Sequence, residues 1–202
     1  MTTAARYEPP EDRSAARSPS EVLLDGFHAF ETPDGFRAEL IEGEIVVTPP
    51  PDGSHESAIA SLVRQVMKRS KLETDASGNK GLSIGGGPDK VDDHVIPDAV
   101  FVPVGAFAGQ GSWMPPDHVL MVAEVTSYKA DRDRGAKRRA YARGNVPLYL
   151  LIDQGEQSAT LFGEPGGSGD LIDYRASTRV PFGKSIELPS PFAFTLETNE
   201  FG

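Results

Sequence analysis

The sequence predicts an α/β domain with a mixed central β-sheet flanked by helices, an N-terminal hairpin and extra C-terminal strands. Two apolar runs rich in β-branched residues, Val95–Val102 and Val119–Val125, each have the composition and length of a strand. A third run, Val146–Ile152, is apolar throughout, which is typical of a strand buried on both faces. Segments with helical spacing of apolar residues separate the strands, so both kinds of element belong to one layered domain.

The composition limits size, location and chemistry. The chain has 202 residues, enough for one sizeable core, and no segment approaches the roughly 18 to 20 apolar residues of a membrane span. It contains no cysteine, which excludes disulfides, thiolate metal sites and a cysteine nucleophile, and which fits a cytoplasmic location. The formal net charge of −10 argues against a protein that coats nucleic acid non-specifically, but it is compatible with a locally basic site.

The first residues differ from the rest of the chain. Residues 1–20 are polar, contain prolines and lack periodicity, which predicts a disordered arm. The remainder shows no internal repeat and no linker. We therefore expect residues 21–202 to form a single domain.

A hairpin is predicted next. The strands are Phe36–Ile41 and Glu44–Val47, and glycine at the second position of the two-residue turn suits a primed turn. In this register Glu39 and Glu44 share one face. Two carboxylates on one face are compatible with a site, which makes Glu44 an auxiliary candidate, but a solvated sheet face is the favoured interpretation.

The segment His55–Lys71 is an amphipathic helix, for which Ser54 is a suitable N-cap. Its apolar stripe predicts core packing and consists of Ile59, Leu62, Val63, Val66 and Met67. His55 is placed to orient a phosphate or a water at the start of the helix. A plain surface histidine is the commoner interpretation.

The other elements are simpler to read. Leu82–Ile84 predicts a short strand before a glycine run that lacks the spacing of a nucleotide-binding loop. A long loop from Gly105 to Asp117 precedes the second apolar run, and a helix is expected over residues 131–143. Ser158–Phe162 predicts the hairpin partner of the third apolar run, and residues 170–194 predict further short strands.

Three charged residues occupy unusual positions. Asp98 and Glu124 each lie inside an apolar strand, where an unpaired carboxylate is costly to bury, so each needs a partner or a metal. Asp133, Lys137 and Tyr141 fall at i, i+4 and i+8 and therefore on one face of the next helix. Salt-bridged strand acids are the alternative, but the joint arrangement favours a metal site.

The same helix is locally basic. Residues 128–143 contain seven Lys or Arg and two Asp, a formal charge of +5 inside an acidic chain. Such an island suits a phosphate backbone, and Arg134, Arg138 and Arg139 are the candidates for nucleic-acid binding, together with His55. An ordinary solvated helix face is an equally good explanation of the charge.

An ordered series of short motifs resembles the bacterial Uma-two family. The series consists of Glu39–Glu44, Pro49–Pro51, His55, Pro97-Asp98, Glu124–Ser127, Asp133 with Lys137 and Tyr141, Val146–Tyr149 and Leu151–Asp153. The resemblance covers roughly residues 36–194. It implies a restriction-endonuclease-like core of the PD-(D/E)XK nuclease superfamily and metal-dependent hydrolysis of phosphodiester bonds, most simply in DNA.

The resemblance also implies roles. Pro97-Asp98 matches the PD motif and Glu124 matches its D/E, so Asp98, Glu124 and the Val125 carbonyl are the expected ligands of Mg²⁺ or Mn²⁺. The superfamily lysine is expected two residues after the acid, where this chain has Thr126. Lys137, displaced onto the following helix, is the expected catalytic lysine, and Asp133, Thr126 and Tyr141 are auxiliary candidates.

Two functions follow from this set of residues. The first is a Mg²⁺- or Mn²⁺-dependent endonuclease acting on DNA, for which a homodimer is one compatible assembly. The second is a catalytically decayed member of the fold that binds nucleic acid or protein. Because two carboxylates without a cation between them repel, we also expect at least one of Asp98 and Glu124 to have a raised pKa.

Overall fold

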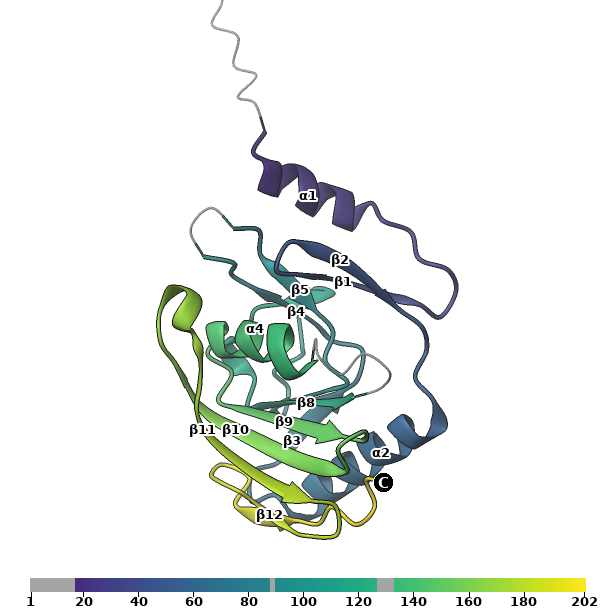
Figure 1. The fold of residues 1–202 in the computed structure, drawn as a ribbon, viewed down its shortest axis with the longest axis vertical. Coiled ribbons are helices and arrows are strands. Elements are labelled where there is room, and N and C mark those ends of the chain that lie inside the picture. The colour runs from purple at the N-terminus through teal and green to yellow at the C-terminus, as the bar shows by residue number, and fades with distance from the viewer. Residues whose placement is uncertain (1–16, 88–89, 127–132) are drawn as a thin grey trace, which may run out of the picture.

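The computed structural model describes residues 17–87, 90–126 and 133–202, which form two main β-sheets, a small third sheet and the helices around them (Figure 1). The five-stranded sheet has the order β2-β1-β5-β4-β7 and the six-stranded sheet the order β11-β10-β9-β8-β6-β3. The strands of the five-stranded sheet are β1 (Arg37–Ile41), β2 (Glu44–Thr48), β4 (Gly81–Ile84), β5 (Asp93–Val95) and β7 (Trp113–Met114). Those of the six-stranded sheet are β3 (Thr74–Ser77), β6 (Ala99–Pro103), β8 (Met121–Thr126), β9 (Leu148–Asp153), β10 (Ser158–Gly166) and β11 (Asp173–Pro181).

The remaining elements cover or connect these sheets. A two-stranded sheet is made by β12 (Ile186–Leu188) and β13 (Phe194–Leu196). The helices are α1 (Pro19–His28), α2 (Gly53–Arg69) and α4 (Arg138–Arg143), with a π-helical turn η2 (Asp133–Lys137) and 3-10 turns η1 (Pro116–His118) and η3 (Gly169–Leu171). None of the helices within the described ranges is long and apolar enough to cross a membrane.

The six-stranded sheet is the mixed central sheet that the sequence predicts. β8 and β9 pair in parallel, whereas β3, β6, β10 and β11 join by antiparallel pairing. Every residue of β8 and β9 is buried, as expected for strands covered on both faces. The predicted α/β class, the N-terminal hairpin and the extra C-terminal strands are confirmed.

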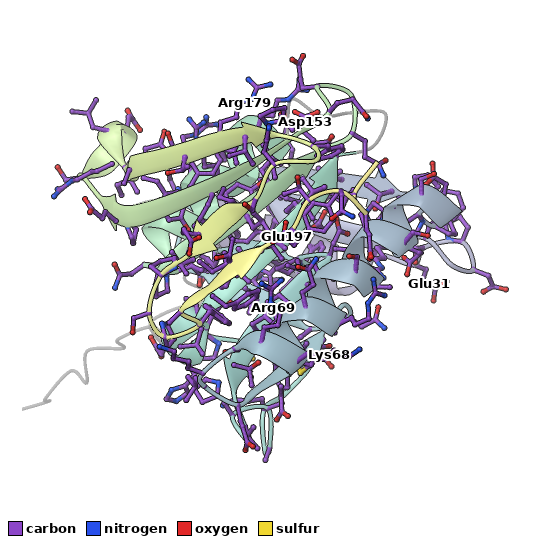
Figure 2. All side chains as sticks on the ribbon, turned by 90° about the horizontal axis from the view of Figure 1, so that it is seen from below. Glu31, Lys68, Arg69, Asp153, Arg179 and Glu197 are labelled. Atoms are coloured by element: carbon purple, nitrogen blue, oxygen red, sulfur yellow. The ribbon has the colours of Figure 1, made fainter. Side chains whose placement is uncertain are left out.

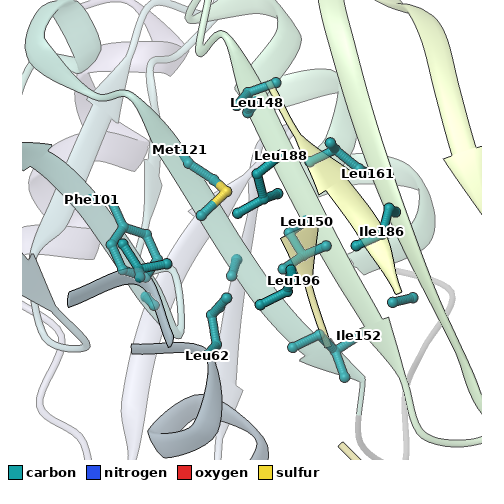
Figure 3. Packing of buried hydrophobic residues seen from close by; sticks show 14 of the residues in the cluster. Leu62, Phe101, Met121, Leu148, Leu150, Ile152, Leu161, Ile186, Leu188 and Leu196 are labelled. Atoms are coloured by element: carbon teal, nitrogen blue, oxygen red, sulfur yellow. The ribbon is translucent and has the colours of Figure 1, made fainter. Parts of the chain in front are cut away.

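Alternating side chains of the central sheet feed two cores. On one face, Leu62 of α2 packs with Met121, Leu150 and the small C-terminal sheet, represented by Leu196 (Figure 3). On the other face, the next residues along the same strands pack against α4 and the five-stranded sheet. Glu124 belongs to this second face, because it alternates with Ala123 and Val125, which face α2.

The predicted strand Val95–Val102 is wrong as a single strand. β5 ends at Val95 in the five-stranded sheet and β6 begins at Ala99 in the six-stranded sheet, so the chain changes sheets between them. Pro97 lies in this crossing, where the lack of a backbone N–H removes one ladder hydrogen bond. Asp98 therefore lies at a junction between sheets and not within a strand.

The predicted hairpin is confirmed, but the prediction that the face with Glu39 and Glu44 is solvated holds for only one of the two residues. Leu40 pairs with Ile45, and Glu42 and Gly43 have φ values of 49° and 84°, as a primed turn requires. Glu44 is exposed, as a solvated face predicts. Glu39, on the same face, is only 4% exposed, so the prediction of a solvated face is wrong at this position.

Two details of helix α2 also differ from expectation. The N-cap is Asp52, whose Oδ1 accepts from the His55 N–H at 2.9 Å, and not Ser54. Leu62 and Val66 of the predicted stripe are buried, but Met67 is 46% exposed and is not part of the core.

The N-terminal and basic helices extend the sequence predictions. Helix α1 begins at Pro19 with a capping box between Ser18 and Glu21, so the predicted arm ends earlier than Ser20. Residues 1–16 and 127–132 lie outside the described residues, and the division into an arm and a domain stays a prediction. The long predicted loop contains β7, which pairs in parallel with β4.

Candidate active site

A cavity of about 790 Å³ lies where the two main sheets meet the start of α2. Its walls come from β1, the proline-rich segment before α2, the junction before β6, the end of β8 and the turn η2. The ionisable side chains that line it are Arg37, Glu39, Asp52, His55, Asp98, Glu124 and Lys137. Segments far apart in the sequence thus bring charged groups into one hollow.

Asp98 is held by two donors on one oxygen. β6 begins at Ala99, opposite Ala123, so β8 runs on past the start of its neighbour. The N–H of Val125 consequently donates to Asp98 Oδ2 at 2.9 Å, and the same oxygen contacts His55 Nε2 at 2.9 Å. Burial alone raises the pKa of Asp98, but the bond to His55, the charge of Lys137 and the backbone N–H lower it below the usual value.

The lowered pKa of Asp98 leaves the expected raised pKa to Glu124, where it stays a prediction. At Asp98 the hydrogen-bond donors and the nearby positive charge outweigh the effect of burial on the pKa. Asp98 therefore stays ionised, which is the state a metal ligand requires.

Glu124 is buried against an ammonium and a phenol. Lys137 Nζ lies 3.1 Å from both carboxylate oxygens of Glu124, and the Tyr141 hydroxyl donates to Oε1. Glu124, Lys137 and Tyr141 are 1%, 6% and 0% exposed, respectively. Burial raises the pKa of Tyr141 well above its usual value, and the charges of Glu124 and Glu39 raise it further. Lys137 and Tyr141 share a helix face as predicted, and this face meets the Glu124 side of the central sheet.

Glu39 is a member of the site that the sequence interpretation missed. Its Oε1 accepts from the Ile96 N–H at 2.7 Å and lies 3.2 Å from Lys137 Nζ. The ammonium thus bridges Glu39 and Glu124. The available signal was that Glu39 shares its hairpin face with Ile41 and Val46, two apolar residues that favour burial over solvation.

His55 is a buried partner of Asp98 and not a surface histidine. It is 5% exposed, and its Nδ1 has no hydrogen-bond partner within the part of the chain that the structure describes. Burial lowers the pKa of His55, but the hydrogen bond to Asp98 and the charges of Asp98 and Glu56 raise it to a value above the usual one. The commoner interpretation of this histidine is therefore wrong.

The auxiliary candidates are divided between the cavity and the surface. Thr126 lines the cavity, donates to Asp153 Oδ1 at 3.2 Å and accepts from the Gln154 N–H at 3.2 Å. Glu44 is exposed and does not line the cavity. The side chain of Asp133 lies outside the described residues.

The predicted nucleic-acid contacts of the basic helix are all paired with carboxylates. Arg134 binds Asp153, Arg138 makes two hydrogen bonds to Asp173 at 2.9 and 2.7 Å, and Arg139 makes two to Glu42 at 2.8 Å. None of the three lines the cavity. Figure 2 shows Asp153 beside Arg179 at the end of the long strands, away from Lys68 and Arg69 on α2. The assignment of these arginines to nucleic acid stays a prediction.

Comparisons with known proteins agree with this architecture. A family model described as "Putative restriction endonuclease", Uma2, matches residues 24–199. The chain belongs to the Uma2 family. A crystal structure of "a putative nuclease belonging to DUF820" from Anabaena variabilis ATCC 29413 has a similar fold, with a TM-score of 0.65 and 16% identity. The match covers 88% of this chain and 96% of that one. No curated protein matches the sequence.

The residues of this Uma2 chain suit a hard divalent cation. Glu39, Asp52, Asp98 and Glu124 contribute four carboxylates to the cavity, and Arg37 and Lys137 contribute two positive charges, which leaves a formal excess of two negative charges when His55 is neutral. Within the described residues, no group of three or more His, Asp or Glu side chains forms a ready-made metal site. A cation held by two carboxylates and water, the usual environment of Mg²⁺, fits both observations.

Proposed function

We propose that this Uma2 protein is a Mg²⁺- or Mn²⁺-dependent endonuclease that hydrolyses phosphodiester bonds in DNA. The supporting observation is the excess of carboxylates in the cavity over the positive charges of Arg37 and Lys137. Burying carboxylates without compensation is costly, so such an excess persists most simply where a cation binds. Membership of a family of nuclease-like proteins supports the same reaction class.

Asp98 and Glu124 would hold the ion, and the Val125 carbonyl is the proposed further ligand. Asp98 has one oxygen engaged by two donors, which fixes the orientation of the carboxylate toward the cavity that it lines. When bound, the ion supplies an activated water and neutralises charge on the phosphate. His55 and Tyr141 keep Asp98 and Glu124 in position by the hydrogen bonds described above.

Lys137 would act on the substrate. Its ammonium has three donors and lies between Glu39 and Glu124 at the wall of the cavity. In the proposed reaction it orients the attacking water or binds the phosphate oxygen that gains negative charge, as a charge-assisted donor. Glu39 holds the ammonium on the side opposite Glu124, which keeps its long side chain ordered without substrate.

A second function, an inactive binding module, rests on different observations. Thr126 stands where the superfamily lysine is expected, and its hydroxyl is engaged by Asp153 and Gln154. The arginines of the basic helix are neutralised within the chain, and the net charge is −10. A protein that binds another protein, or nucleic acid weakly, is compatible with these features.

The deciding experiment compares two glutamates. Plasmid and oligonucleotide DNA are incubated with Mg²⁺, Mn²⁺ or EDTA and with wild type, Glu124→Gln or Glu44→Gln. The matched control is Glu44, which is exposed and outside the cavity. We expect metal-dependent cleavage that Glu124→Gln reduces by orders of magnitude and Glu44→Gln leaves unchanged. Equal activity of wild type and Glu124→Gln would show that the cleavage arises elsewhere.

Melting curves test the metal without a substrate. A divalent ion at tenfold excess over its Kd adds about 1.4 kcal/mol to the free energy of unfolding. At about 2 to 4 °C per kcal/mol, wild type should melt about 3 to 6 °C higher with Mn²⁺ than with EDTA. A wild type that neither cleaves nor responds to Mn²⁺ would exclude the metal-dependent nuclease and leave the binding module.

A further inference from the structure

We propose that Arg37 forms a second phosphate subsite, which binds a phosphate of the DNA strand next to the one that is cleaved. The inference rests on the proposed nuclease function and adds a requirement to it: the preferred substrate carries at least two neighbouring phosphodiesters. Arg37 is not among the residues that the sequence motifs point to, and it is not in the basic helix.

Arg37 is on the substrate side of the hairpin. It precedes Glu39 by two residues on β1, so both side chains leave the same face of the strand, and both line the cavity. At about 3.4 Å per residue their backbone positions are roughly 7 Å apart, a separation similar to that between neighbouring phosphorus atoms along one DNA strand. Arg37 is thus beside the carboxylate cluster and outside it.

A turn next to Asp98 orients the guanidinium. Arg37 Nη2 donates to Asn79 Oδ1 at 2.9 Å. The preceding residue of that turn, Gly78, packs so closely that a Cβ there would lie 2.9 Å from the backbone oxygen of Asp98. The turn is therefore fixed against the junction that carries Asp98, and Asn79 gives the Arg37 guanidinium a hydrogen-bond partner on that turn.

No acid within the described ranges neutralises the charge of Arg37. Its described partner is a neutral amide, and no carboxylate within the described residues forms an ion pair with it. In this respect it differs from Lys137, which contacts Glu39 and Glu124, and from the arginines of the basic helix. A half-buried guanidinium with a neutral partner keeps its planar set of donors for an anion, and phosphate is the anion that this geometry suits.

The start of α2 lies along the same part of the cavity as Arg37. Arg37 pairs with Thr48 across the hairpin, and the chain passes from there through Pro49–Pro51 to the N-terminus of α2, all along the cavity. The 17 residues of α2 direct the positive end of the helix dipole to this wall. Two carboxylates of the cavity also lie at this end of α2, namely Asp52 as its N-cap and Asp98 bonded to His55. Arg37 therefore supplies the positive charge that a phosphate needs on this flank.

Two substrates separate this subsite from the cleavage site. Bis(p-nitrophenyl) phosphate has one phosphodiester and cannot reach both positions, whereas a DNA oligonucleotide can. Cleavage of each is measured for wild type, Arg37→Gln, Arg37→Lys and the control Arg69→Gln. Arg69 lies near the end of α2, 14 residues after His55 (Figure 2). This places it about 21 Å from His55 along the helix axis, which is about two Debye lengths at 0.1 M salt.

We expect Arg37→Gln to raise KM for the oligonucleotide with little change in kcat and to leave the small substrate unaffected. Loss of one phosphate contact reduces the slope of log K against log salt by about 0.9, which corresponds to about eightfold weaker binding at 0.1 M salt. Arg37→Lys should keep the slope and recover part of the KM, because it retains the charge without the planar donors. Arg69→Gln should match wild type.

Each other result overturns a particular claim. A fall in kcat on both substrates means that Arg37 serves the cleaved phosphate or the fold, and an unchanged oligonucleotide KM and salt slope means that it binds no phosphate. If wild type cleaves neither substrate, the proposed function fails, and the subsite is then tested by oligonucleotide binding measured by fluorescence anisotropy. A slope of log K against log salt that is reduced in Arg37→Gln supports the subsite. An unchanged slope, or no binding by wild type, rejects it.

Discussion

Replacing Lys137 with methionine removes the ammonium that lies between two buried carboxylates. Glu39 and Glu124 are 4% and 1% exposed and lie 3.2 and 3.1 Å from Lys137 Nζ. Methionine fills a similar volume, so the main effect is electrostatic. Breaking a buried ion pair by removing one partner costs about 3 to 5 kcal/mol, because the other charge stays buried without compensation.

The expected fall in melting temperature follows from this cost. At about 2 to 4 °C per kcal/mol for a domain of this size, Lys137→Met should melt about 6 to 20 °C below wild type in EDTA. The matched control is Arg139→Met, two positions further along the chain. Arg139 and its partner Glu42 have side chains that are each 39% exposed, and an exposed pair is worth up to about 1 kcal/mol, so the control should lose no more than about 4 °C.

Differential scanning fluorimetry with EDTA and with Mn²⁺ measures both effects. The variant keeps the four carboxylates of the cavity but has lost the Lys137 ammonium, so Mn²⁺ should raise its melting temperature more than it raises that of wild type. Equal melting temperatures for Lys137→Met and Arg139→Met in EDTA would refute the reasoning, because they would show that the two carboxylates do not depend on the ammonium.

Two further predictions concern the groups that hold the carboxylates. A raised folded-state pKa means that protonated His55 stabilises the fold fully below its unfolded pKa of about 6.5, and that this stability is lost as pH rises through the higher folded value. Wild type should therefore exceed His55→Gln in melting temperature by more at pH 6 than at pH 8, and Asp98 is ionised at both pH values. A melting-temperature difference that does not change with pH would contradict this. Tyr141→Phe removes a buried donor to Glu124 and should cost about 1.5 to 3 kcal/mol, or about 3 to 12 °C, in the same assay. An unchanged melting temperature for Tyr141→Phe would mean that this hydrogen bond adds nothing to stability.

Local patterns in the sequence were enough to predict the type of most elements. Period-two and continuous apolar runs predicted the hairpin, β8, β9 and β10, and the 3.6-residue period predicted α2. Glu124 and Lys137 could be singled out in the same way, because a lone carboxylate in an apolar strand and a lysine on a helix face are visible within a few residues. These features depend on side-chain direction along one element, which the period alone determines.

The split of the predicted strand Val95–Val102 could not be read from the same patterns. An apolar run indicates burial, but it does not indicate which sheet buries each half. β5 pairs with β1 and β4, whereas β6 pairs with β3 and β8, and these partners come from distant parts of the chain. Asp98 consequently gained a position at the junction, where the N–H of Val125 could reach its carboxylate.

The partners of the charged groups were decided by the tertiary structure alone. Glu39 was expected to be solvated and His55 to be a surface residue, but packing buries both and joins them to residues 57 and 43 positions away. Arg139 was expected to contact nucleic acid, but it pairs with Glu42, 97 positions earlier. The sequence determines which residues can carry charge and on which side of an element they lie. Whether that charge is buried, paired or available depends on contacts between distant segments, because the energy of a charge depends on its surroundings in space and not on its neighbours in the chain.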